Sequence, residues 1–186
     1  MINFSKAEIK DLILSVLGIA LIFSYPNFGS FPLFLLVVVI SFVFHELAHR
    51  SLAEKFGYAA IYKMWPLGLI IALFFAIGSG GLIKFVAPGA VYILPRAFGR
   101  WKFKTRSSES EMGLISLSGP AVNLFFGVFF GLFSGYIFNV LSMINLWLAF
   151  INLLPIPPLD GSKVLRWKPW LWLVVFIISL VLFWFR

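Results

Sequence analysis

The chain has 186 residues, of which 61% are hydrophobic and 12% are charged, with a formal net charge of +8 and no cysteine. Soluble domains carry roughly 25% charged residues, so this composition excludes an ordinary soluble protein and indicates a membrane protein. The absence of cysteine excludes disulfides, thiolate metal sites and a cysteine nucleophile. Because Lys and Arg fall in short segments between apolar runs, we interpret the positive charge as a topology signal and not as a nucleic-acid surface.

The first predicted element is an anchor helix over residues 5–25. Lys6 and Lys10 precede the apolar run Leu12 to Phe23, as in a secretory signal, but no small-residue cleavage site follows. Ser5 and Glu8 have the spacing of a capping box, in which each side chain bonds the other residue's backbone. The sequence therefore predicts an uncleaved helix that begins at this box.

A second helix is predicted from Phe31 to about Leu52, and its last turns contain His45, Glu46 and His49. These are the chain's only two histidines, and four residues is about one helical turn, so both imidazoles project from one face and can share a metal. Glu46 lies about 100° around the helix, beside the metal instead of on it. The HExxH motif predicts a mononuclear zinc site in a bilayer.

The segment between this helix and the later helices is predicted to be re-entrant or a β-hairpin. An apolar stretch from Trp65 to Ile77 is followed by a glycine-rich break at residues 78–81 and by a second stretch from Ile83 to Leu94. Irregular backbone at membrane depth is tolerated only against protein or water. Residues 83–94 favour a strand with a tight turn at Pro88-Gly89, but half of a helical hairpin is an equal alternative.

Three more helices complete an all-α polytopic membrane protein of five to six transmembrane helices. A basic loop over residues 96–106 comes first, and we expect it to serve topology and anionic lipid contact, with docking of a substrate's tail as an alternative. Residues 108–111 predict a second capping box. The predicted helices are Glu111 to Phe138, Leu141 to Leu154 and Pro169 to Phe185.

The distribution of charge predicts the orientation of the chain. Residues 12–44 contain no charge, whereas Lys and Arg gather at the opposite ends of the helices. The positive-inside rule makes the basic ends cytoplasmic. We therefore expect a multi-pass protein of a prokaryotic cell membrane with its active site nearer the cytoplasmic side.

A third metal ligand can be sought by elimination among the acids. Glu8, Glu109 and Glu111 have capping roles, Asp11 suits a helix start, and Glu54 lies about 140° off the ligand face. Asp160 has no evident local partner, and a buried carboxylate costs ~2.5 to 3.5 kcal/mol on insertion scales. A divalent cation would compensate this cost. The predicted metal ligands are His45, His49 and Asp160.

At these residues the chain resembles the site-2 protease family of intramembrane zinc metalloproteases. The family pairs HExxH with a later NxxPxxxxDG motif, which Asn152, Pro155, Asp160 and Gly161 match. Residues 118–120 and Asn123 are also similar to the family's preceding helix, although Asn123 by itself reads as an interhelical hydrogen-bond anchor. The resemblance implies a single membrane-embedded protease domain over residues 1–186, with a core at about 31–163 and peripheral helices at 5–25 and 169–185.

The resemblance also implies a mechanism and partners. Glu46 would be the general base of a site with one Zn²⁺ per chain, and Asn152, eight residues before Asp160 on the same predicted helix, would donate to the oxyanion or position the substrate. The substrates would be transmembrane helices of other proteins, which must unwind, and a strand within residues 83–94 would receive them by β-augmentation. The expected partners are these substrates and the lipid bilayer, not nucleic acid; the oligomeric state is unknown.

Two alternatives remain open from the sequence. One is a membrane metalloprotease with a water-facing site whose third ligand is Glu109 or Glu111. The other is a non-catalytic zinc-binding membrane protein that acts in transport, scaffolding or chaperoning.

Overall fold

The computed structural model describes residues 4–82, 84, 88–95, 97–98, 102–103 and 108–186. The chain forms two compact units. Unit 1 comprises Met1–Val43 and Ile61–Tyr92, and unit 2 comprises Phe44–Ala60 and Ile93–Arg186.

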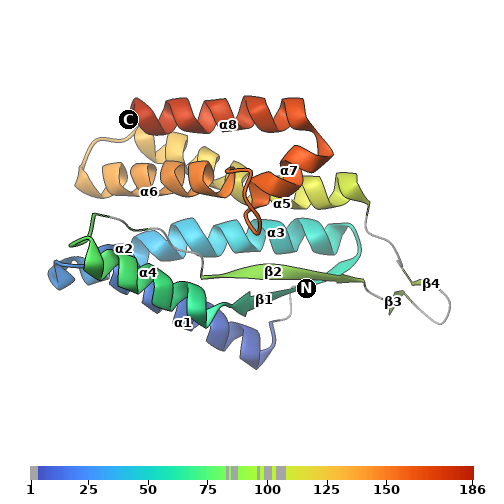
Figure 1. The fold of residues 1–186 in the computed structure, drawn as a ribbon, viewed down its shortest axis with the longest axis horizontal. Coiled ribbons are helices and arrows are strands. Elements are labelled where there is room, and N and C mark those ends of the chain that lie inside the picture. Colours follow the sequence, from blue (N-terminus) through green and yellow to red (C-terminus); the bar gives the residue numbers. More distant parts are fainter. Residues whose placement is uncertain (1–3, 83, 85–87, 96, 99–101, 104–107) are drawn as a thin grey trace. The chain divides into compact units, whose positions relative to one another are not determined.

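Unit 1 begins with helix α1, whose start was predicted correctly. Ser5 caps the helix: its Oγ accepts the Glu8 backbone N–H at 3.2 Å, and Glu8 Oε2 accepts the Ser5 N–H at 3.4 Å. The elements of unit 1, coloured blue to green in Figure 1, are α1 (Lys6–Ser24), a 3-10 turn η1 (Phe28–Ser30), α2 (Phe31–Val38), a π-helical turn η2 (Val39–Val43), most of β1 (Tyr58–Met64), α4 (Pro66–Gly78) and the start of β2 (Gly89–Pro95).

Strands β1 and β2 pair in a small sheet, which corrects the all-α prediction. Strand β1 was not predicted. For residues 83–94 the strand alternative is confirmed from Gly89 onward, while residues 83 and 85–87 lie outside the described part. The prediction of a tight turn at Pro88-Gly89 is wrong, because Gly89 is the first residue of strand β2. A Cβ at Gly89 would collide with the Lys63 carbonyl oxygen and the Tyr62 hydroxyl, so glycine permits close strand approach there.

Polar side chains on one face of α1 hold β1 in place. Glu8 Oε1 accepts the Tyr62 backbone N–H at 3.0 Å, and Asp11 Oδ2 accepts the Met64 N–H at 3.2 Å. One turn further along, Ser15 Oγ lies 2.8 Å from the Tyr62 hydroxyl. Although residues 5–25 were expected to be peripheral, α1 satisfies backbone donors along one edge of the strand.

Unit 2 contains α3 and the four C-terminal helices, which are coloured yellow to red in Figure 1. Helix α5 packs against α3, α6 and α7, and α8 packs against α6 and α7. Gly127 allows α5 and α6 to approach closely, because a Cβ there would meet Leu146 Cδ2 at 2.5 Å. The elements are α3 (Phe44–Lys55), the start of β1, β3 (Ala97–Phe98), β4 (Lys102–Phe103), α5 (Glu109–Gly131), α6 (Tyr136–Asn152), α7 (Asp160–Trp167) and α8 (Pro169–Trp184).

Three predictions in unit 2 are wrong in detail. The helix predicted to reach Phe138 ends at Gly131, and the chain turns at Gly135, whose φ of 125° suits glycine. Ser108 gives α5 no side-chain cap, because its Oγ bonds Ser110 Oγ at 2.6 Å. Asn152 and Asp160 do not share a helix: a proline-rich segment over residues 155–158 separates α6 from α7.

Among the described residues, two helices are long and apolar enough to cross a bilayer, Phe28–Lys55 and Glu109–Gly131. Three further apolar helices are shorter: Pro66–Gly78, Tyr136–Asn152 and Pro169–Trp184. The structure thus confirms a mostly helical chain, and the count of five to six spans stays a prediction. In the predicted basic loop, β3 and β4 pair antiparallel, and Arg96, Arg100, Lys104 and Arg106 lie outside the described residues.

Candidate metal centre

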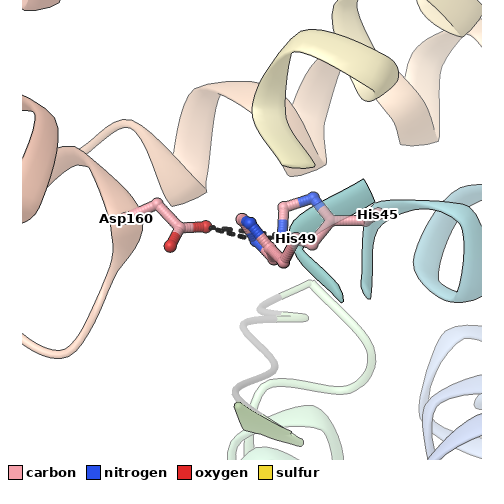
Figure 2. A group of neighbouring side chains, drawn as sticks. All are labelled: His45, His49 and Asp160. Atoms are coloured by element: carbon pink, nitrogen blue, oxygen red, sulfur yellow. Dashed lines mark hydrogen bonds and ion pairs between the residues drawn. The ribbon is translucent and has the colours of Figure 1, made fainter. Parts of the chain in front are cut away.

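Two histidines from α3 and one aspartate from α7 converge in unit 2. Asp160 Oδ2 lies 3.0 Å from His49 Nε2 and 3.4 Å from His45 Nε2, and the two Nε2 atoms are 3.0 Å apart. Figure 2 shows the carboxylate facing both rings. All three residues are buried. Two imidazoles and one carboxylate form a donor set that leaves a position open on a four-coordinate metal, as catalytic zinc requires.

Asp160 reaches the histidines because a compact segment over residues 153–159 connects α6 to α7. Helix α6 ends at Asn152, and α7 starts at Asp160 itself. A Cβ at Gly161 would strike the Leu153 carbonyl, so the Asp-Gly pair allows this backbone to pass closely. Ser162 Oγ donates to the Leu159 carbonyl at 2.7 Å and holds the first turn of α7. The glycine of the DG motif is therefore a packing requirement of the segment that presents the aspartate.

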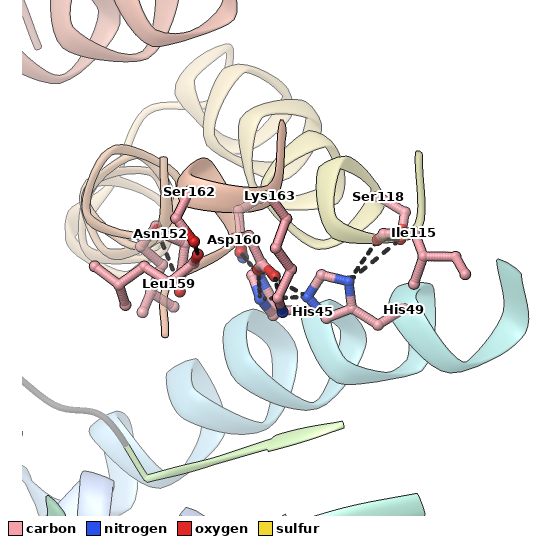
Figure 3. A network of polar contacts seen from close by, with 11 residues as sticks. His45, His49, Ile115, Ser118, Asn152, Leu159, Asp160, Ser162 and Lys163 are labelled. Atoms are coloured by element: carbon pink, nitrogen blue, oxygen red, sulfur yellow. Dashed lines mark hydrogen bonds and ion pairs between the residues drawn. The ribbon is translucent and has the colours of Figure 1, made fainter. Parts of the chain in front are cut away.

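Helix α5 orients both imidazole rings. His49 Nδ1 lies 2.7 Å from the Ile115 carbonyl oxygen, and His45 Nδ1 lies 2.6 Å from Asn123 Oδ1. Figure 3 shows the His49 contact beside Ser118, whose hydroxyl donates to the same carbonyl at 2.6 Å. A carbonyl only accepts, so His49 donates from Nδ1 and its Nε2 keeps a lone pair toward Asp160.

Gly119 leaves the space that these rings occupy. A Cβ at this position would lie 2.6 Å from His49 Cε1 and 2.7 Å from His45 Cε1. Real Cβ atoms essentially never make contacts this short. Any side chain at this position of α5 would therefore displace the two candidate ligands.

The surroundings of Glu46 also indicate that His45, His49 and Asp160 suit a metal ion. Its Oε2 is buried and has no hydrogen-bond partner, the one such side-chain atom found among the described residues. The carboxylate lies within electrostatic range of His45, Asp160 and Lys163. A second uncompensated carboxylate beside His45, His49 and Asp160 is costly unless a cation is present. The donor set, the glycine-lined space and this unsatisfied oxygen together fit a divalent metal.

The charge state of Asp160 suits a ligand. Burial opposes ionisation, but as long as His49 and His45 are protonated, their charges and hydrogen bonds outweigh it and hold the pKa of Asp160 below its usual range. Lys163 adds a cation 3.7 Å from Asp160 Oδ1. Asp160 is therefore an anion available to a metal.

The acids excluded by elimination have other partners in several cases, though not always the predicted ones. Glu111 accepts a hydrogen bond from the Tyr58 hydroxyl, and Glu54 pairs with Arg50 at 2.9 Å. Asp11 binds the Met64 N–H of β1. Across the described ranges, His45, His49 and Asp160 form the one cluster of three or more such side chains that could hold a metal.

The structure places Asn152 at the end of α6, where its Nδ2 donates to the Leu148 carbonyl at 2.9 Å. Asn123 was predicted to be an interhelical anchor, and its bond from Nδ2 to Asn145 Oδ1 at 2.8 Å confirms this. Its contact with His45 was missed, as were Ile115 and Asn145. The only signal for the last was a polar residue inside an apolar helix.

Comparisons with known proteins agree with this geometry. The model of the family described as "Peptidase family M50" matches residues 132–170, which include the DG motif. The chain is 42% identical over 186 residues to "Putative zinc metalloprotease MJ0611" of Methanocaldococcus jannaschii, covering 93% of this chain and 91% of that protein. It is 30% identical to "Putative zinc metalloprotease YwhC" of Bacillus subtilis over 77% of this chain and 72% of that protein. No solved structure matches.

Proposed function

Because the chain belongs to peptidase family M50, the site-2 proteases, we propose that it is an intramembrane zinc metalloprotease that cleaves peptide bonds within or near transmembrane helices of other proteins. The observation that carries the proposal is the buried convergence of His45, His49 and Asp160 beside an unsatisfied Glu46 oxygen. Both relatives are named putative zinc metalloproteases, which supports this activity.

One zinc ion per chain would be held by His45, His49 and Asp160. When bound, zinc supplies a Lewis acid that makes water nucleophilic at neutral pH and polarises the scissile carbonyl. The chain supplies the remaining groups. Helix α5 fixes the rings through Ile115 and Asn123, and the burial of the three ligands excludes bulk water.

Glu46 is the proposed general base and acid. It precedes His49 by three residues on α3, so helix geometry places it next to the ligand face but off it. Its unpaired Oε2 accepts a proton from the attacking water, and the same carboxyl returns that proton to the leaving amine. A hydrogen-bonded carboxylate would be a weaker base than this one.

Asn152 is proposed to donate to the developing oxyanion or to position the substrate. An amide nitrogen carries two hydrogens, and the bond to Leu148 uses one of them. The second hydrogen is the one assigned to substrate. Removing one oxyanion donor typically lowers kcat by about 10² to 10³.

Strand β2 is proposed to receive the unwound substrate. Glu8 and Asp11 occupy the Tyr62 and Met64 N–H groups on one edge of β1. The opposite edge faces β2, since Trp65 N–H donates to the Pro88 carbonyl at 2.7 Å. Among the described strands only β1 pairs with β2, so the outer edge of β2 is the edge offered for β-augmentation.

We also propose a multi-pass location in a prokaryotic cell membrane, with the metal centre nearer the cytoplasmic side. The two candidate spans and the archaeal and bacterial relatives support this location. The orientation depends on the basic ends of the helices and the positive-inside rule.

The test uses purified protein in detergent and in liposomes. Wild-type protein should contain one zinc per chain, measured by elemental analysis, and cleave a co-reconstituted membrane-spanning substrate. We expect Glu46→Ala to keep zinc and lose cleavage, and Asp160→Ala to lose zinc. A substrate that accumulates on the Glu46→Ala protein identifies the partner.

Two outcomes favour the alternatives. Zinc that survives Asp160→Ala but is lost in Glu109→Ala or Glu111→Ala indicates a glutamate ligand. Zinc-loaded wild type that cleaves no membrane-spanning substrate indicates a non-catalytic zinc protein.

A further inference from the structure

A chain of hydrogen bonds runs from α6 through α5 to the His45 ring. Asn145 Nδ2 donates to the Leu141 carbonyl at 2.8 Å, and Asn123 Nδ2 donates to Asn145 Oδ1 at 2.8 Å. Asn123 Oδ1 in turn lies 2.6 Å from His45 Nδ1. Asn123 and Asn145 are fully buried within unit 2, at 0% exposure.

The Leu141 end of this series of hydrogen bonds determines the direction of each bond in it. The Leu141 backbone carbonyl can only accept, so the Asn145 atom that faces it must be the amide nitrogen. Asn145 therefore presents its oxygen to Asn123, which must donate. Asn123 is left with its oxygen toward His45, and the ring can satisfy that oxygen only by donating from Nδ1.

The consequence for His45 is a single tautomer. With the proton on Nδ1, Nε2 keeps its lone pair, and Nε2 is the atom that lies 3.0 Å from His49 Nε2 and 3.4 Å from Asp160. His49 reaches the same state in one step through the Ile115 carbonyl. A partner on the far nitrogen of a ligating histidine also fixes the ring's orientation and raises its basicity.

We propose that Asn145 is a positioning residue for the metal centre: acting through Asn123, it sets the tautomer and orientation of His45 and so strengthens zinc binding. This inference rests on the proposed zinc site. Asn145 lies on α6 and is linked to His45 through Asn123.

The primary test compares zinc affinity in Asn145→Leu and Ser142→Ala, by competition with a chromophoric chelator in detergent. Ser142 lies on the same helix, is equally buried and donates to the Gly127 carbonyl of α5 at 2.7 Å, but it has no link to His45. We expect Asn145→Leu to weaken zinc binding about 10- to 100-fold, the range for lost outer partners of metal ligands. Ser142→Ala should bind zinc like the wild type even if it unfolds at lower temperature.

A rescue variant separates positioning from packing. In Asn123→Asp/Asn145→Leu the carboxylate accepts the His45 proton without help from residue 145, as in carboxylate–histidine–zinc triads. We expect this double variant to bind zinc more tightly than Asn145→Leu alone. A purely structural role for Asn145 predicts no recovery, and such a result overturns the proposal.

A spectroscopic measurement keeps the proposal testable if Asn145→Leu does not fold. The chain has two histidines, so ¹⁵N-histidine labelling reports only the two ligand rings. In the zinc-loaded wild type both Nδ1–H protons should exchange slowly with solvent. Rapid exchange at His45 refutes the proposed hydrogen-bond connection from Asn145 through Asn123 to His45. If wild-type protein binds no zinc, both the proposed function and the role of Asn145 are overturned. If Asn145→Leu and Ser142→Ala bind zinc equally well, only the role of Asn145 is overturned.

Discussion

Substitution of Gly119 by alanine should damage the candidate metal centre although it replaces none of the three ligands. The added Cβ would lie 2.7 Å from His45 Cε1, whereas ordinary van der Waals contact begins at 3.4 Å. His49 Nε2 would lie closer still, at 2.4 Å, so the rings or the α5 backbone must move by 0.7 to 1.0 Å to restore ordinary contact. Metal–ligand distances tolerate only about ±0.2 Å, so a displacement of this size cannot be absorbed while both imidazoles bind one ion.

The expected result is a loss of zinc affinity on the order of 100-fold, the upper end of the range for perturbed outer partners of metal ligands. Unfolding should become easier by about 1–3 kcal/mol, because an extra methyl group overpacks a filled interface. Zinc affinity is measured by chelator competition, and stability by thermal unfolding in detergent with and without zinc.

Two other glycines provide matched controls. Gly127→Ala also overpacks α5, but against the flexible Leu146 side chain, so it should lower stability and leave zinc affinity unchanged. Gly78→Ala adds a methyl where no other atom lies within 4 Å, and neither property should change. If Gly119→Ala binds zinc as tightly as Gly127→Ala does, the inference that Gly119 provides room for the rings is wrong.

Three further predictions follow from the same contacts. Gly161→Ala drives a Cβ into the Leu153 carbonyl and should displace Asp160, so we expect zinc content to fall sharply even in protein that still inserts into membranes. Glu8→Ala leaves the buried Tyr62 N–H without its acceptor and should cost about 1–3 kcal/mol in thermal unfolding, and an unchanged transition would contradict the anchoring role of α1. Removal of metal with a chelator should abolish cleavage and lower the unfolding temperature, since zinc at 100 times its Kd adds about 2.7 kcal/mol; readdition should restore both.

Features that depend on local spacing could be predicted from the sequence. The capping box at Ser5 and Glu8 involves residues three apart, and the structure shows both of its bonds. The common face of His45 and His49 follows from one helical turn. These contacts need no knowledge of how distant segments pack.

Strand β1 could not be predicted, because the usual signal was hidden. Its burial alternates, with Tyr58, Ala60 and Tyr62 buried and the residues between them less so. In a soluble protein the intervening positions would be polar, and the period of two would be visible. Here they are Ala59 and Ile61, so residues 58–62 contain no charge and do not reveal which face is buried.

The elimination that selected Asp160 reached the cluster seen in the structure partly through wrong assignments. Glu111 was set aside as a capping residue, but it bonds the Tyr58 hydroxyl, a partner 53 positions away. Asp160 was placed on the same helix as Asn152, but it opens a separate one. Asp160 could be selected despite these errors, because the chain has only seven acids and burying any of them in an apolar protein requires compensation.

The histidine side of the candidate metal centre is an interface between two helices, each of which presents residues four apart. On α3 these are His45 and His49, and on α5 they are Ile115, Gly119 and Asn123. Rows with this spacing run along a helix surface and interlock when two helices pack. His49 meets Ile115 and His45 meets Asn123, with Gly119 between them, so the two rows run in opposite directions. The HExxH motif therefore supplies only one side of the site, and the glycine and asparagine of α5 are the complementary side that holds both rings in one orientation.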